Sequence, residues 1–157
     1  MKAAVVVYPG TNCEHDVVWA LGIAGAEAEL VWHRETDLSE FDGIVLPGGF
    51  AHGDALRTGA IARFSPVMAE VKRLADDGIP VLGICNGFQV LCEAHMLPGA
   101  LHQNRDLTFI CRPIHIRVET TDSILTRAAE VGQVLNIPLN SYEGNFTVAD
   151  PAAMNGK

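Results

Sequence analysis

The stretch of sequence that decides the fold is Pro80-Val81-Leu82-Gly83-Ile84-Cys85-Asn86-Gly87-Phe88-Gln89. In it, a short apolar run typical of a buried strand is followed directly by the first turn of an amphipathic helix. Such a sharp turn holds its central residue in a strained, exposed position near the helix N-terminal amides, which favour a thiolate and an oxyanion. Glycines on both sides let neighbouring backbone pass close by. The stretch therefore predicts a nucleophile elbow with Cys85 as the nucleophile, over the alternative of a small buried thiol in a core strand.

Strands and helices alternate on the amino-terminal side of this elbow. In chain order, the apolar patterns predict a strand at 3–8, a helix at 17–23, strands at 29–32 and 43–46, and a helix at 67–74. We expect Ser65 to cap the last of these helices, with Pro66 at its first position. The alternation predicts an α/β fold, with a mostly parallel sheet, helices on both faces, and ligands beyond the carboxyl ends of the strands.

The pattern changes after the elbow helix. Apolar and polar residues alternate from Thr108 to Glu119, which predicts an antiparallel extension, and 134–137 is a further short strand candidate. No periodicity is convincing from Tyr142 to Lys157. The length favours a single domain over 1–157.

Composition excludes several classes of function. The chain of 157 residues has a formal net charge of −8 and scattered basic residues, which argues against nucleic-acid binding. No apolar run approaches the roughly 20 residues that cross a bilayer, and the start lacks a signal-peptide layout, so we expect a cytoplasmic protein without a membrane partner. Neither the four cysteines nor the histidines have metal-ligand spacing, and we expect free thiols and no bound metal.

A thiolate at an elbow suits attack on an acyl carbon, and the resulting oxyanion needs backbone N–H donors. We predict that Gly49, Phe50 and Asn86 supply them, because Pro47-Gly48-Gly49-Phe50 ends a strand at the same edge of the sheet. An ordinary turn is the alternative interpretation of the glycine pair. Gln89 lies one helical turn after Cys85, and we predict that it binds a polar substrate rather than being a surface glutamine.

Acyl transfer also needs a group that accepts and donates protons. The segment 47–50 is called the oxyanion loop below, and His52 is the one histidine close to it in sequence. Proximity in sequence does not fix geometry, and a place on the loop surface is the favoured interpretation of His52.

Several stretches are similar to one known family, the glutaminase subunits of phosphoribosylformylglycinamidine synthase, which are class I glutamine amidotransferases of purine biosynthesis. They span nearly the whole chain, and Gly53-Asp54 with Leu56-Arg57, and Cys85-Asn86-Gly87-Phe88-Gln89, are the most particular to this family. The other matching stretches are 8–13, 45–50, 59–62, 83–84, 97–101, 109–112 and 143–145.

The resemblance implies a flavodoxin-like fold in which Cys85 attacks the side-chain amide of glutamine. A γ-glutamyl thioester would form, ammonia would leave, and water would release glutamate. The ammonia would pass to a separate synthetase subunit, joined in many bacteria by a small third subunit. ATP and magnesium would bind the synthetase, and this chain would hold no cofactor.

The sequence departs from the family pattern in two places. The family carries its catalytic His and Glu in a His-x-Glu motif near the carboxyl end. The carboxyl-terminal part of these 157 residues lacks this motif, so we expect a domain incomplete at that end. Ser141-Tyr142 precedes Glu143 where the family has His-Gly, in a region that the resemblance implies lines the glutamine pocket. We therefore expect a nucleophile without its base.

Two other functions stay open. One is an inactive fragment or docking module that binds the synthetase without hydrolysing glutamine. The other is a different cysteine-elbow hydrolase, although those proteins typically have His directly after the cysteine, where this chain has Asn86.

Overall fold

The computed structural model describes residues 1–150 and 152. The described residues divide into two compact units, the first comprising Met1–His102 with 145–150 and 152, and the second Gln103–Gly144. Each unit is described by itself below. That 1–157 acts as one domain stays a prediction.

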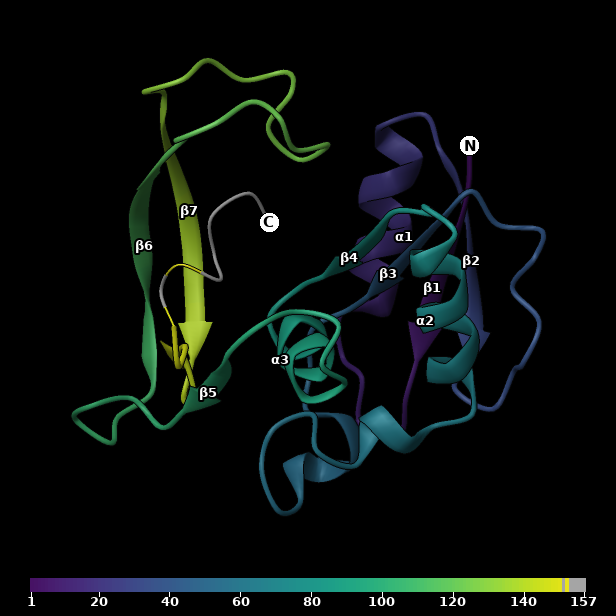
Figure 1. The fold of residues 1–157 in the computed structure, drawn as a ribbon, viewed down its shortest axis with the longest axis horizontal. Coiled ribbons are helices and arrows are strands. Elements are labelled where there is room, and N and C mark those ends of the chain that lie inside the picture. The colour runs from purple at the N-terminus through teal and green to yellow at the C-terminus, as the bar shows by residue number, and fades with distance from the viewer. Residues whose placement is uncertain (151, 153–157) are drawn as a thin grey trace. The chain divides into compact units, whose positions relative to one another are not determined.

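Four parallel strands form the sheet of the first unit (Figure 1). They are β1 (Lys2–Val7), β2 (Glu27–Trp32), β3 (Gly43–Leu46) and β4 (Val81–Gly83), in the spatial order β2-β1-β3-β4. In register, Val5 of the central strand β1 lies beside Leu30 of β2 and Val45 of β3. All four residues of β3 are buried, as expected for a strand covered on both faces. The parallel sheet predicted from the sequence is confirmed.

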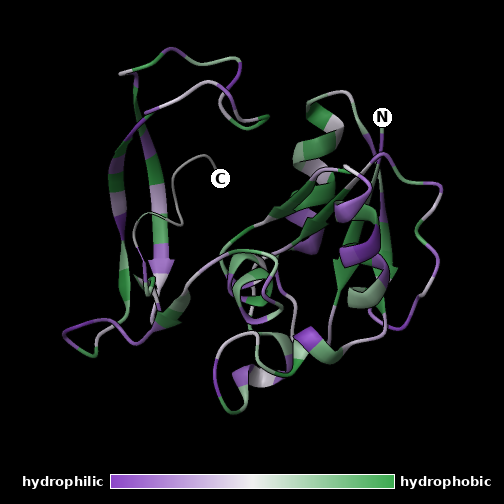
Figure 2. Ribbon diagram, in the orientation of Figure 1, coloured by the Kyte–Doolittle hydropathy of each residue, from purple (hydrophilic) through white to green (hydrophobic). Residues whose placement is uncertain are grey.

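Helices cover both faces of this sheet, because successive side chains of a strand point to opposite sides. Val5 and Val45 pack on one face with Val17 of α1 (Glu14–Ile23). The other face, which includes Val6 and Leu46, packs against α2 (Val67–Asp76) and α3 (Asn86–Glu93). Figure 2 shows the hydrophobic strands between these helices. The two-sided α/β architecture is therefore also confirmed.

The start of α2 differs from the prediction. The helix begins at Val67 with Pro66 as its N-cap, one residue after the predicted first position. The Ser65 hydroxyl lies 3.0 Å from Nδ1 of His33, which is also buried. The serine therefore hydrogen-bonds a core histidine, and its predicted side-chain cap is wrong because this tertiary partner takes the hydroxyl.

A two-stranded antiparallel pair was not predicted from the sequence. It joins β5 (Ala100–His102) to β8 (Asn145–Thr147), and the ring of Phe146 in β8 lies 5.7 Å from that of Phe88 in α3. Strands of three residues are too short to show a period of two.

The second unit is built on an antiparallel hairpin-like pair, β6 (Ile110–Arg117) and β7 (Val134–Ser141). The alternating pattern predicted β6, and the candidate strand at 134–137 runs on to Ser141. Within the described residues the pair forms its own two-stranded antiparallel sheet. The turn after β7 is held by Asn104, which bonds the carbonyl of Ser141 at 2.8 Å and the amide of Gly144 at 3.0 Å.

Two further segments complete the described part of the first unit. The short 3-10 turns η1 (Ala51–Asp54) and η2 (Ala62–Phe64) lie between β3 and α2.

Among the residues described, none of the helices combines the length and apolar character that a membrane crossing needs.

Gly87 allows α3 to lie directly against β3. A Cβ atom at Gly87 would overlap the backbone carbonyl of Leu46, whereas a Cβ at Gly22 in α1 would meet nothing within 4 Å. We expect Gly87→Ala to lower the free energy of unfolding by about 1–3 kcal/mol or more, because the contact is with backbone. Gly22→Ala, the matched control in a helix, should raise it by up to about 1 kcal/mol through helix propensity. Urea unfolding of both variants measures this, and a Gly87→Ala chain as stable as wild type would contradict the packing described.

Candidate active site

The elbow has the geometry that the sequence predicts. Cys85 lies between β4 and α3 with φ 50° and ψ −107°, a strained backbone for a residue other than glycine. A Cβ at Gly83 would lie 2.7 Å from the amide nitrogen of Phe88, so this glycine is needed for α3 to lie against β4. Both glycines of the motif therefore bring the helix so close that the chain must turn sharply at Cys85.

The surroundings of Cys85 raise the pKa of its thiol. Cys85 is exposed as a residue, but the surrounding protein still removes part of the water around its thiol, and this desolvation raises the pKa of Cys85. Nearby Cys13 and Asp54 raise this pKa further. A hydrogen bond from the Asn86 amide opposes the rise. The helix N-terminus thus favours the thiolate as expected, but desolvation and neighbouring acidic groups outweigh it.

The glycine loop after β3 lies beside the nucleophile. A Cβ at Gly48 would be 3.6 Å from the Cβ of Cys85 and 3.5 Å from the sulfur of Cys13. The loop is tied to the segment after β1, because the Asn12 and Cys13 amides donate to the Gly48 carbonyl at 3.1 and 3.2 Å. The structure therefore brings together the elbow and the predicted oxyanion loop.

The residues 10–13 were missed as part of the site by reasoning from the sequence. Gly49 has φ +143°, and a Cβ there would lie 2.7 Å from the Asn12 amide nitrogen and 2.8 Å from the Gly10 carbonyl oxygen. The sequence did contain a signal for this segment. Pro9 and Gly10 end a buried strand, and in parallel sheets the loops at the carboxyl ends of strands bind ligands.

The three predicted oxyanion donors differ in their present partners. The Phe50 amide donates to the Gly10 carbonyl at 3.0 Å, so it could serve an oxyanion only if this bond broke. The Gly49 amide has no acceptor within 1–150 and 152. The Asn86 amide already points at the Cys85 sulfur. An oxyanion hole from Gly49 and Asn86 needs less rearrangement than one that includes Phe50, and all three roles stay predictions.

The Gln89 side chain is turned into the protein. Gln89 is buried, and its Oε1 accepts a hydrogen bond of 2.9 Å from Nδ2 of Asn86. This places Gln89 in support of Asn86, and substrate binding by Gln89 stays a prediction.

His52 is partly buried rather than on the loop surface. Its ring lies 5.3 Å from that of His33 and 6.3 Å from that of Tyr8, between centroids. Its buried Nε2 has no hydrogen-bond partner among the described residues. His52 therefore packs near Tyr8 and His33, and it lines a cavity together with His33.

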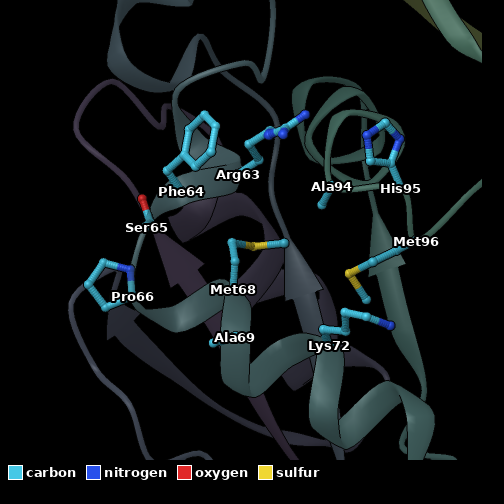
Figure 3. Close-up of a pocket in the computed structure, with 10 residues that line it drawn as sticks. All are labelled: Arg63, Phe64, Ser65, Pro66, Met68, Ala69, Lys72, Ala94, His95 and Met96. Atoms are coloured by element: carbon cyan, nitrogen blue, oxygen red, sulfur yellow. The ribbon is translucent and has the colours of Figure 1, made fainter.

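Three cavities of the first unit lie outside this constellation, and one of them, of about 610 Å³, is lined by His33 and His52. A second, of about 400 Å³, is shown in Figure 3 and lies between η2, α2 and the end of α3; its walls carry Arg63, Lys72 and His95. The third, of about 440 Å³, is nearly apolar and extends from Cys13 and Ile84 along α1. None of the three is lined by Cys85. Within 1–150 and 152, no group of three or more His, Cys, Asp or Glu side chains is arranged to hold a metal ion.

Comparison with known proteins gives a consistent result. Residues 1–156 match the family described as CobB/CobQ-like glutamine amidotransferase domain. The chain is 52% identical over 151 residues to the phosphoribosylformylglycinamidine synthase subunit PurQ of Koribacter versatilis, covering 96% of this chain and 65% of that one. It is 53% identical over 154 residues to the subunit PurQ of Rubrobacter xylanophilus, covering 98% of this chain and 70% of that one. The chain thus spans about two thirds of the length of these relatives.

Solved structures are similar as well. The structure of PurLQS from Thermotoga maritima matches with a TM-score of 0.92 at 41% identity, covering 96% of this chain and 70% of that chain. A glutamine amidotransferase from the same organism, at 15% identity, shares the fold with a TM-score of 0.62, covering 94% of this chain and 63% of that one.

The effect of the Asp54 charge on the pKa of Cys85 can be tested through the reactivity of the Cys85 thiol. Asp54→Asn removes a charge that raises the pKa of the Cys85 thiol, while an asparagine oxygen can still accept from Asn86. We expect faster alkylation by iodoacetamide at neutral pH and a pH–rate midpoint shifted downward, because more thiolate is present below the pKa. The rate is followed on the Cys85 peptide by mass spectrometry.

Asp16→Asn is the matched control for this prediction. Asp16 raises the pKa of Cys13 and is not among the charges that act on Cys85. An Asp54→Asn midpoint equal to that of Asp16→Asn, or higher, would contradict the electrostatic account.

Proposed function

This chain belongs to the family of PurQ subunits of phosphoribosylformylglycinamidine synthase, within the glutamine amidotransferases, and we propose that it hydrolyses glutamine at Cys85 to supply ammonia. The observation that carries the proposal is the strained Cys85 elbow beside the Gly48-Gly49 loop. A nucleophile and backbone donors at the same edge of the sheet are what acyl transfer requires.

The reaction proceeds in two halves. The Cys85 thiolate attacks the side-chain amide carbon of glutamine, and the oxyanion that forms is stabilised by the amides of Gly49 and Asn86. When the tetrahedral intermediate collapses, the C–N bond breaks, and the nitrogen takes a proton and leaves as ammonia. Water then attacks the γ-glutamyl thioester, and glutamate and the free thiol are released.

The raised pKa of Cys85 sets a requirement for this reaction. A proton acceptor must take the thiol proton before or during attack, and the same group can return it to the leaving nitrogen. The contacts described for His52 are with Tyr8 and His33, and we do not assign it this role.

We propose that the ammonia is used by a synthetase partner, together with a small third subunit, in forming formylglycinamidine ribonucleotide. The similarity to PurLQS from Thermotoga maritima supports such an assembly. In this proposal ATP and magnesium act in the synthetase, and the chain works in the cytoplasm, where four free cysteines suit a reducing compartment.

The experiment measures ammonia and glutamate release from glutamine by this chain and its Cys85→Ala variant, each with and without the synthetase and third subunit. We expect release that depends on Cys85, with a loss on the order of 10⁴-fold or more in Cys85→Ala, as for removal of other catalytic nucleophiles. Cys111→Ala, which removes another exposed thiol, is the control.

Other outcomes separate the remaining functions. A folded chain that binds the synthetase but releases no ammonia would oppose the proposal and favour a docking role. Selective labelling of Cys85 by a glutamine-like electrophile, over Cys13, Cys92 and Cys111, distinguishes a glutamine site from an unrelated cysteine-elbow hydrolase.

A further inference from the structure

The side chain of Asn86 is buried between the elbow and the loop that follows Phe50. Asn86 is 2% exposed, and it makes three hydrogen bonds through its side-chain amide. Its Oδ1 accepts from the Ala51 amide at 2.9 Å, and its Nδ2 donates to Asp54 Oδ1 at 3.0 Å and Gln89 Oε1 at 2.9 Å. All the contacts lie within the first unit.

These three bonds require one acceptor and two donors on a single short side chain. A carboxamide provides both, whereas a carboxylate has no donor and a hydroxyl only one. Buried polar groups cost little only when they are paired, and the Ala51 amide would lose its partner without the asparagine oxygen. An asparagine at position 86 therefore satisfies all three buried partners, which a carboxylate or a hydroxyl cannot do.

The loop that Asn86 contacts is strained. His52, Gly53 and Asp54 have φ values of 55°, 70° and 51° in succession. Residues other than glycine adopt such angles at a cost, and they persist only where surrounding contacts hold them. Just beyond, Arg57 is tied to α3 by two bonds of 2.6 Å to Glu93, so a second contact restrains the same segment.

We propose that the Asn86 side chain is the positioning group that holds the oxyanion loop against the nucleophile elbow. Its backbone amide points at Cys85, and its side chain fixes Ala51, the second residue after Gly49. One residue thus sets the position of Gly49 relative to its own amide, and these are two of the three predicted oxyanion donors. The effect on catalysis rests on the proposed glutaminase function, whereas the effect on the loop does not.

Two variants test this inference. Asn86→Ala removes all three side-chain bonds. Asn86→Asp keeps the acceptor for Ala51 but turns a carboxylate toward the oxygens of Asp54 and Gln89, which is repulsive. Adding Asp54→Asn to Asn86→Asp restores the bond with donor and acceptor exchanged, so it should rescue what the single change damages.

The first readout is amide hydrogen exchange of this chain, which does not need activity. We expect the Ala51 amide, within 47–56, to exchange roughly 10- to 100-fold faster in Asn86→Ala, with β1 unchanged. Asn86→Asp should behave similarly, and the double variant that combines N86D with D54N should recover part of the protection. Asn104→Ala is the matched control, since Asn104 is also a buried asparagine with three side-chain bonds, and it should leave 47–56 unchanged.

The second readout is glutamine hydrolysis with the synthetase partner. We expect kcat to fall roughly 10- to 100-fold in Asn86→Ala with little change in KM, because a displaced oxyanion donor acts only in the transition state. Alkylation by iodoacetamide, which forms no oxyanion, should change much less. A merely structural role would lower both reactions together.

The outcomes are separable. Unchanged exchange at Ala51 in a folded Asn86→Ala chain, faster exchange of the whole first unit, or no rescue of N86D by D54N would overturn the inference. A wild-type chain that does not hydrolyse glutamine would count against the proposed function alone, because the exchange experiment still decides whether Asn86 holds the loop.

Discussion

The site depends on how closely α3 approaches the strands and loop around it. Gly87 touches the carbonyl of Leu46 in β3, and Gly83 lets β4 lie under the same turn of helix. Gly59 approaches from the loop side, where a Cβ would be 2.8 Å from the Val90 amide nitrogen and 2.9 Å from the Gln89 carbonyl carbon. At these three glycines, backbone therefore packs directly against backbone, with no side chain between the two segments. Because the helix begins so close to the sheet, the chain must reverse direction within one residue, and Cys85 has a backbone that relaxed chains avoid.

This packing has opposite effects on the nucleophile. It directs a helix N-terminal amide at the sulfur, which favours the thiolate. It also desolvates the thiol and places the charge of Asp54 nearby, and the net result is a raised pKa for Cys85. A protonated thiol is a weak nucleophile and also resists oxidation. The geometry thus places the thiol beside the predicted oxyanion donors, and the proposed reaction additionally requires a group that removes the thiol proton.

Sequence reasoning succeeded where the signal was local. The central strands are buried on both faces and so are continuous apolar runs, and the elbow is marked by glycines two positions on either side of Cys85. It failed where a tertiary partner decided the outcome. Ser65 was expected to cap a helix, but His33, distant in sequence, takes its hydroxyl. The oxyanion role of the Phe50 amide stays a prediction, and in this structure the amide donates to the Gly10 carbonyl. The strands β5 and β8 are simply too short to carry a period.

Asn86 shows why such a site cannot be assembled from spacing alone. Its side-chain partners Ala51 and Asp54 are 35 and 32 residues away, and no periodicity connects them to the elbow. Asn86 is the first residue of α3, so its backbone N–H has no acceptor within the helix and is available for another partner. The amide can therefore serve the sulfur while the side chain, on the inner face, serves the loop. Any residue except proline would offer the amide at this position, but only a short carboxamide satisfies the buried partners. The side-chain identity at position 86 is therefore set by the loop and not by the nucleophile it follows.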